Sequence, residues 1–273
     1  MNYKLIISLL FCACLTVACG ETEKNSSDAL TMAANGAHRS ASNISRNLPR
    51  HSVETLNFFG IEPTMAVMEI WPGSGGWYTE ILAPYLRDQG TFYAANFTGS
   101  TGVQYYSKAA DKFKKKIGAN ASVYDKVQIV DLMPPADLIP IPNNTVDLIV
   151  TFRNLHNWVN NGIADDMFEI FFKALKPGGT LGLVAHRANS DNPGLENAKT
   201  GYLAESEAIK LAEDAGFSFE EKSDINANPK DTKDYADGVW TLPPNFKKGD
   251  VDKAKYEAIG ESDRMTLRFS KPS

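Results

Sequence analysis

The sequence has no cysteine after residue 19, although it continues to residue 273. Its three cysteines, Cys12, Cys14 and Cys19, all lie at the N-terminus. The remaining chain can therefore form no disulfide bond, and it can use no thiol as a nucleophile or metal ligand.

The chain also lacks a long apolar run and an excess of positive charge. The apolar run of residues 5–17 is shorter than the roughly 20 residues that a membrane-spanning helix needs. A net charge of -5 gives no indication of nucleic-acid binding. With 43% hydrophobic and 22% charged residues, the composition is that of a globular protein with one large α/β domain or two small ones.

The N-terminus has the pattern of an export signal. Lys4 precedes the apolar run, and small residues follow it, which predicts a signal peptide over residues 1–18. Residues 15–20, Leu-Thr-Val-Ala-Cys-Gly, resemble a bacterial lipobox, in which cleavage before Cys19 leaves a cysteine that carries lipid. We therefore expect an exported protein on the periplasmic side of a bacterial membrane, anchored to it through Cys19. Simple signal cleavage and an unprocessed buried strand are the alternatives.

Residues 19–50 are rich in Ser, Asn, Ala and Thr and show no convincing apolar period. This composition predicts a flexible tether, with a short helix near its end. A single domain is then expected over residues 51–273. His38 and His51 have no partner at metal-ligand spacing, so they are interpreted as exposed bystanders.

The body of the chain alternates between short apolar runs and amphipathic stretches. The runs predict strands at 66–71, 91–97, 127–130, 146–152, 180–185, 217–222 and 265–269. The amphipathic stretches predict helices at 77–86, 105–117, 165–175 and 206–215. This alternation is typical of an α/β fold: a doubly wound, mostly parallel seven-stranded sheet with helices on both faces and an antiparallel last strand.

A glycine-rich turn, Pro-Gly-Ser-Gly-Gly at 72–76, follows the first strand. In such sheets, ligands bind beyond the carboxyl ends of the strands, next to this turn. Glycine lets the backbone approach a ligand closely, and the following helix offers unpaired N–H groups. A tight turn with a purely structural role is the alternative.

A dinucleotide-binding fingerprint is not complete at this turn. Counted from Gly73, its third glycine would fall at Tyr78, and the second strand ends on Asn96 rather than on an acid. A nicotinamide-dependent oxidoreductase is therefore only a third hypothesis.

Several motifs together resemble a known family. Residues 69–75, Glu-Ile-Trp-Pro-Gly-Ser-Gly, resemble the first motif of class I S-adenosylmethionine (SAM)-dependent methyltransferases, which has an acid four residues before a Gly-x-Gly turn. Asp131 after the third strand and Leu-Lys-Pro-Gly-Gly at 175–179 match further landmarks in the same order. Residues 152–157 and 263–265 are similar to those of a bacterial group of predicted, exported or lipoprotein methyltransferases of unknown substrate.

The resemblance extends over residues 50–273 and implies a Rossmann-like methyltransferase fold with SAM as the cofactor. It implies that Gly73, Ser74 and Gly75 form the turn that faces the methionine part of the cofactor. Glu69 would hold the cofactor ammonium, through water.

For the adenosine part, the resemblance implies that Asp131 accepts from the adenine amino group, with the N–H of Leu132 beside it. The acid that usually binds the ribose hydroxyls is missing. Asn96 is the nearest substitute, and its neutral amide forms weaker hydrogen bonds than a carboxylate.

Polar residues after the fourth strand are the candidates for catalysis, because this family places substrate-facing residues there. His156 is the candidate base for a hydroxyl or thiol substrate, and a packing role is its alternative. Asn154 would bond the reacting group or the cofactor. Arg153 would bind an anionic substrate, or would pair with Asp147 or Asp166.

His186 and Arg187 end the fifth strand on the same rim, so they are expected to form one polar pocket with the residues after the fourth strand. No acid stands at helical spacing from either histidine, and no metal site is expected. Four aromatic residues would form the walls of the pocket or part of the core: Trp71, Trp77, Tyr78 and Trp158. Asp263 and Arg264 are interpreted as a structural ion pair.

Two functions follow from these observations. The first is a SAM-dependent methyltransferase acting on a small-molecule substrate. The second is an exported binding module that has kept the methyltransferase fold and lost the reaction. Export conflicts with the first function, because SAM is made in the cytosol, and the missing acid after the second strand favours the second. Glu69, Asp131 and the glycine turn favour the first.

Overall fold

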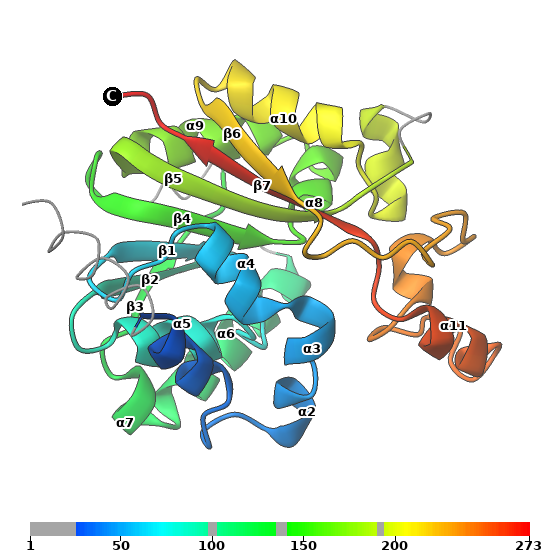
Figure 1. Cartoon of the computed structure of the whole chain (residues 1–273), viewed down its shortest axis with the longest axis horizontal. Helices are drawn as coiled ribbons and strands as arrows, with labels where there is room; N and C mark the ends of the chain where they lie inside the picture. The colour runs from blue at the N-terminus through cyan, green and yellow to red at the C-terminus, as the bar shows by residue number, and fades with distance from the viewer. Residues whose placement is uncertain (1–25, 98–102, 135–140, 190–193) are drawn as a thin grey trace, which may run out of the picture.

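The computed structural model describes residues 26–97, 103–134, 141–189 and 194–273 (Figure 1). The predicted signal peptide and Cys19 lie outside these residues. The strands are β1 (Ala66–Ile70), β2 (Thr91–Asn96), β3 (Gln128–Asp131), β4 (Val146–Phe152), β5 (Leu175–His186), β6 (Ser218–Ser223) and β7 (Arg264–Ser270).

These strands form one sheet in the order β3-β2-β1-β4-β5-β7-β6. Strands β1 to β5 pair in parallel, and β7 pairs antiparallel with both β5 and β6. The doubly wound, seven-stranded sheet predicted from the sequence is thus confirmed. Because β1 has β2 on one side and β4 on the other, the strand order reverses at β1, and this is the position where such sheets bind ligands.

Helices cover both faces of the sheet (Figure 1). They are a helix over 26–34, α2 (Ala41–Ile44), α3 (Asn47–Arg50), α4 (Ser52–Phe58), α5 (Thr79–Leu86), α6 (Gln104–Gly118), α7 (Ala121–Tyr124), α8 (Leu155–Asn160), α9 (Ala164–Ala174), α10 (Glu205–Asp214) and α11 (Lys253–Ile259). Two short 3-10 helices, η2 (Leu195–Thr200) and η3 (Gly238–Thr241), complete the described helices.

The sheet separates two hydrophobic cores. Ile70 and Ile149 point into the core beneath α9 and α10, whereas Val67 and Val150 point into the core beneath α4 and α5. This follows from the strand geometry, because successive side chains of a strand alternate between the two faces.

The described part of the expected tether belongs to the folded domain. Within the helix over 26–34, Leu30 and Ala34 are fully buried in the second core. The hydroxyl groups of Ser26 and Tyr85 lie 2.6 Å apart and form a hydrogen bond. The described residues 26–50 are therefore not the flexible tether that the composition predicts. A few buried apolar residues and several hydrogen bonds are enough to hold this segment against the domain.

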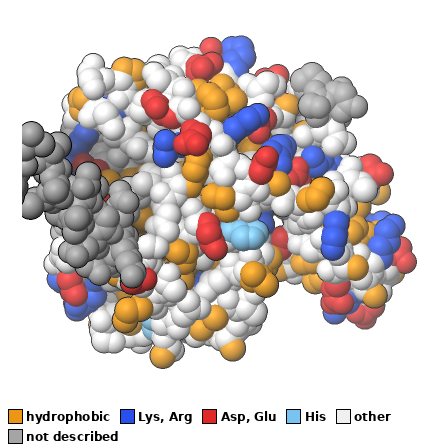
Figure 2. Space-filling model, viewed as in Figure 1, with side chains coloured by type: hydrophobic (Ala, Val, Ile, Leu, Met, Phe, Trp, Pro, Cys, Tyr) orange, Lys and Arg blue, Asp and Glu red, His pale blue; other side chains and the backbone are white. Residues whose placement is uncertain are grey.

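The connection between β6 and β7, residues 224–263, extends beyond the sheet and carries η3 and α11 (Figure 1). Basic and acidic side chains are mixed over the outer surface of the lobe around α11 (Figure 2). None of the helices in the described ranges has the length and apolar character required to cross a lipid bilayer.

Candidate active site

A cavity of about 340 Å³ lies at the carboxyl ends of the central strands. Its lining includes residues 69–73 within and after β1, Phe97 and Tyr106, and residues 152–154, 156 and 157 after β4. Residues 239, 240 and 242–245 of the β6–β7 connection add a further wall. The cavity therefore lies at the switch point that the sequence predicts.

The turn after β1 has an unusual backbone conformation. Trp71 has a φ of 49° and Gly73 a φ of 68°, both in the left-handed region that L side chains rarely adopt. A Cβ atom added to Gly73 or Gly75 would meet no atom within 4 Å, so the two glycines face open space. Gly73 lines the cavity, whereas Ser74 does not.

Glu69 lies in β1 and lines the cavity, although its exposed fraction is only 3%. Its Oε2 accepts a hydrogen bond of 2.6 Å from the hydroxyl of Thr79 at the start of α5. Burial raises the pKa of Glu69 to about 8, against the lowering effects of Thr79 and the charge of Lys116. Binding of a cation beside this carboxyl would therefore release the proton of Glu69.

The residues expected to bind adenosine do not line the cavity. Asn96 is 1% exposed, and its Nδ2 donates to the carbonyl of Gly73 at 3.2 Å. The N–H of Leu132 donates to the carbonyl of Asn96 at 2.9 Å, and Asp131 pairs with Asn96 in the sheet. These polar groups hold the ends of β2 and β3 together.

An aromatic surface takes the place of polar groups on this side of the cavity. The ring centroid of Trp71 lies 4.8 Å from that of Phe97 and 6.2 Å from that of Tyr106, and all three rings line the cavity together with Tyr105. The indole Nε1 of Trp71 donates to the carbonyl of Leu132 at 2.8 Å. Such a surface suits stacking with a planar base.

The two histidines meet at the opposite side of the cavity. The ring centroids of His156 and His186 lie 5.6 Å apart. His156 belongs to α8, and its Nδ1 is buried without a hydrogen-bond partner in the described part of the chain. Burial, with the charge of Arg153, lowers the pKa of His156 to about 4, so its imidazole is neutral at pH 7. His186 Nδ1 lies 2.6 Å from the hydroxyl of Ser262, and burial also lowers its pKa.

Asn154 and Arg153 line the cavity from the loop after β4. The Nδ2 of Asn154 donates to the carbonyl of Ile70 at 2.8 Å and so fixes the loop to the end of β1. Arg153 has a φ of 64°, burial lowers its pKa, and the acid whose charge raises that pKa is Glu261. Asp147 instead pairs with Lys176.

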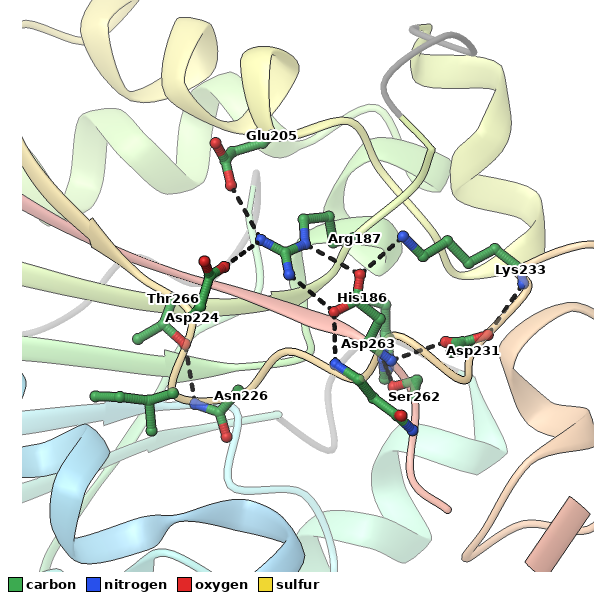
Figure 3. A network of polar contacts seen from close by, with 12 residues as sticks. His186, Arg187, Glu205, Asp224, Asn226, Asp231, Lys233, Ser262, Asp263 and Thr266 are labelled. Atoms are coloured by element: carbon green, nitrogen blue, oxygen red, sulfur yellow. Dashed lines mark hydrogen bonds and ion pairs between the residues drawn. The ribbon is translucent and has the colours of Figure 1, made fainter. Parts of the chain in front are cut away.

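Arg187 does not join the polar pocket, in contrast to the expectation. It bonds both carboxylate oxygens of Asp263, and it also bonds Asp224 (Figure 3). Asp263 also pairs with Lys233, whereas the expected ion pair between Asp263 and Arg264 is not formed. Arg264 bonds Glu261 instead. This network holds the β6–β7 connection against the end of β5.

The cavity also has lining residues that the sequence did not predict, among them Arg50, Phe97, Tyr105, Tyr106, Trp240, Glu261 and Ser262. Arg50 lies in the segment interpreted as a tether, where the cations are arginines after residue 24. Since arginine is the preferred cation for buried ion pairs, the use of arginine without lysine in this segment could have indicated that it packs against the domain. Within the described residues, no group of three or more His, Cys, Asp or Glu side chains could hold a metal ion.

No protein-family model and no curated protein matches this sequence. Among solved structures, the chain is similar to a SAM-dependent methyltransferase from Aquifex aeolicus, with 17% identity, 83% of this chain and 92% of that chain covered, and a TM-score of 0.55. It is similar to a Methanosarcina mazei protein described as a SAM-dependent methyltransferase, with 13% identity, coverage of 80% and 96%, and a TM-score of 0.53.

A third similar structure is the [4+2]-cyclase SpnF, with 14% identity, coverage of 82% and 81%, and a TM-score of 0.55. At these identities the comparisons establish the fold, which is that of the class I methyltransferases. The fold does not by itself specify the reaction, since one of these neighbours is described as a cyclase.

Proposed function

We propose that this protein is a SAM-dependent methyltransferase acting on a small-molecule substrate. The observation that carries the proposal is the cavity at the switch point, in which one open space adjoins the aromatic surface, Glu69 and Gly73, and the residues after β4. The methyltransferase fold of the neighbouring structures supports it.

The residues present fit the cofactor, although the contacts to its adenosine part differ from those that the sequence resemblance implies. Glu69 would hold the ammonium group, and the open space beside Gly73 would receive the methionine part. The adenine would stack on Phe97 and the tyrosines rather than bond to Asp131 and Asn96, whose environment keeps them off the cavity surface.

The bound cofactor would supply a methyl group on a positively charged sulfur, an activated donor that needs little from the protein beyond alignment and exclusion of water. Asn154 keeps the loop that carries Arg153 and His156 fixed against β1. Neutral His156 is available to accept a proton from a hydroxyl substrate, although a pKa of about 4 makes it a weak base.

Calorimetric titration of the purified protein with SAM and with S-adenosylhomocysteine tests the proposal. We expect saturable binding of both and a rise in melting temperature. Absence of heat and of any thermal shift at millimolar ligand would reject the methyltransferase function. Gly73→Val tests the role of the turn. Its side chain would project into the open space proposed for the cofactor, at a φ of 68° that L side chains rarely adopt, and should weaken binding.

A second candidate function is a binding module that has lost the reaction. It is favoured by the burial of Asn96 and by the low pKa of His156, which leave the site without a ribose-binding acid and without a strong base. Cofactor binding without formation of S-adenosylhomocysteine, across a panel of acceptors, would favour this candidate.

We also propose that the protein is exported and lipid-anchored, on the pattern of residues 5–20. Palmitate labelling of cells that express the full chain tests this. Label that is lost in Cys19→Ser would support the anchor, and label that remains, or is absent from both, would contradict it.

A further inference from the structure

Four arginines surround the carboxylate of Glu261 at one end of the cavity. Arg46 approaches its Oε1 to 2.6 Å, and Arg264 donates to its Oε2 at 3.1 Å. Burial alone would raise the pKa of Glu261, but the arginine charges lower it below its ordinary value. Even with Glu261 ionised, this end of the cavity has an excess of positive charge.

Arg50 belongs to this group, and part of its hydrogen-bonding capacity is unused. It lines the cavity with an exposed fraction of 2%, and its Nε and Nη1 have no hydrogen-bond partner among the described residues. Its Nε lies 3.5 Å from Glu261 Oε2, an ion pair longer than a good hydrogen bond. A buried donor without an acceptor costs about 1–3 kcal/mol, so Arg50 keeps hydrogen-bonding capacity that Glu261 does not fill.

Arg153 adds a second cation to the same end of the cavity. Burial, followed by the like charge of Arg153, lowers the pKa of Arg50. The two guanidinium groups therefore repel one another as the structure stands. His156 and His186, which also line this end, are neutral at pH 7 and do not offset the excess charge.

We propose that this end of the cavity is an oxyanion-binding site, where Arg50 and Arg153 bind a carboxylate or phosphate group of a small organic acid. Trp77 and Trp240 line the same cavity, so the bound molecule would have an apolar or aromatic body. The inference that this acid is the methyl acceptor rests on the proposed function, whereas the anion site can be tested without any cofactor.

The first test compares matched ligands on the unmodified protein. Calorimetry without cofactor would measure the affinity for benzoate, for phenyl phosphate and for benzamide, the neutral counterpart of benzoate. We expect at least one anion to bind roughly tenfold more tightly than benzamide, and the difference between the two anions identifies the preferred acid. Equal affinities for benzamide and both anions would overturn the proposal.

The second test separates direct contact from general positive charge. Arg50→Gln should weaken binding of the preferred anion about tenfold, whereas Arg46→Gln, which removes the same charge beside Glu261 but does not line the cavity, should weaken it less than about threefold. Equal losses would contradict a contact with Arg50. Circular dichroism verifies that both variants fold, and the ligand comparison above does not depend on them.

The two proposals can fail separately. Anion binding without binding of S-adenosylhomocysteine would reject the methyltransferase function and retain the site. Binding of S-adenosylhomocysteine without any preference for anions would reject the site and retain the function.

Discussion

Trp71 Nε1 and the carbonyl oxygen of Leu132 form a hydrogen bond of 2.8 Å that joins the end of β1 to the end of β3. The indole ring therefore lies over the edge of the sheet where the sequence resemblance places adenosine contacts. Its partners Phe97 and Tyr106 complete an aromatic surface on that side of the cavity. In the proposed cofactor complex, stacking of the adenine on this surface would supply affinity that polar contacts from β2 and β3 do not.

Restoring the missing acid at Asn96 should therefore not improve cofactor binding. In Asn96→Asp, the donor Nδ2 is replaced by an oxygen that faces the carbonyl of Gly73, which lies 3.2 Å from Nδ2. We expect the free energy of unfolding to fall by about 1–3 kcal/mol, since a buried hydrogen bond becomes a repulsion. Urea denaturation and titration with S-adenosylhomocysteine measure the two effects, and tighter binding would show that residue 96 does reach the ribose.

Glu69 should make stability depend on pH in a recognisable way. Its pKa of about 8 lies above the value of 4.5 for an unperturbed carboxyl group, so its proton stabilises the folded state at low pH. This contribution is lost as the pH rises from about 4.5 to about 8. Glu69→Gln should be more stable than the unmodified protein by roughly 3–5 kcal/mol at pH 8, and by little at pH 4.5. A stability difference that does not change with pH would contradict the raised pKa.

The same carboxyl should couple cofactor binding to proton release. Calorimetry in buffers of different ionisation enthalpy should detect up to one proton released per S-adenosylhomocysteine bound at pH 7, where Glu69 is largely protonated. In Glu69→Gln this release should be absent. Release of the same size in both proteins would assign the proton to another group.

His156 should remain neutral down to acidic pH. Burial and Arg153 lower its pKa to about 4, so its ring resonances should not shift between pH 8 and pH 5 in an NMR titration. Arg153→Met removes a nearby positive charge and should raise the pKa of His156. A midpoint near 6.5 in the unmodified protein would show that the ring is solvated, and would favour a different role for this residue.

Asp263 should be far more important for stability than Asp224, although both bond Arg187. Asp263 is buried and also bonds Lys233, whereas the side chain of Asp224 is 83% exposed. We expect Asp263→Asn to cost about 3 kcal/mol, and Asp224→Asn less than about 1 kcal/mol. Urea denaturation measures both, and similar costs would contradict the structural role of the network in Figure 3.

The central sheet could be predicted because its strands and helices have distinct periodicities. The expected strand over 146–152 coincides with β4, and the helix expected at 165–175 is α9, shifted by one residue. The turn at 72–76 correctly located the cavity, because the ligand position in such sheets follows from strand order.

The remaining parts of the site depend on contacts between distant residues. Arg46 and Glu261 are 215 residues apart and meet only in the folded protein. The part of residues 224–263 that lines the cavity has no regular apolar period, so its position could not be predicted from the sequence. Asn96 is buried, with its Nδ2 on the carbonyl of Gly73, and no local pattern indicates the left-handed backbone of Trp71 and Gly73 in that turn.

A crystal structure of the protein grown with millimolar S-adenosylhomocysteine tests the central claim most directly. We expect adenine density against Phe97 and the neighbouring tyrosines, with the ammonium group beside Glu69. Density in which the ribose hydroxyls bond to Asn96, or a cavity that contains no ligand at saturating concentration, would contradict the account.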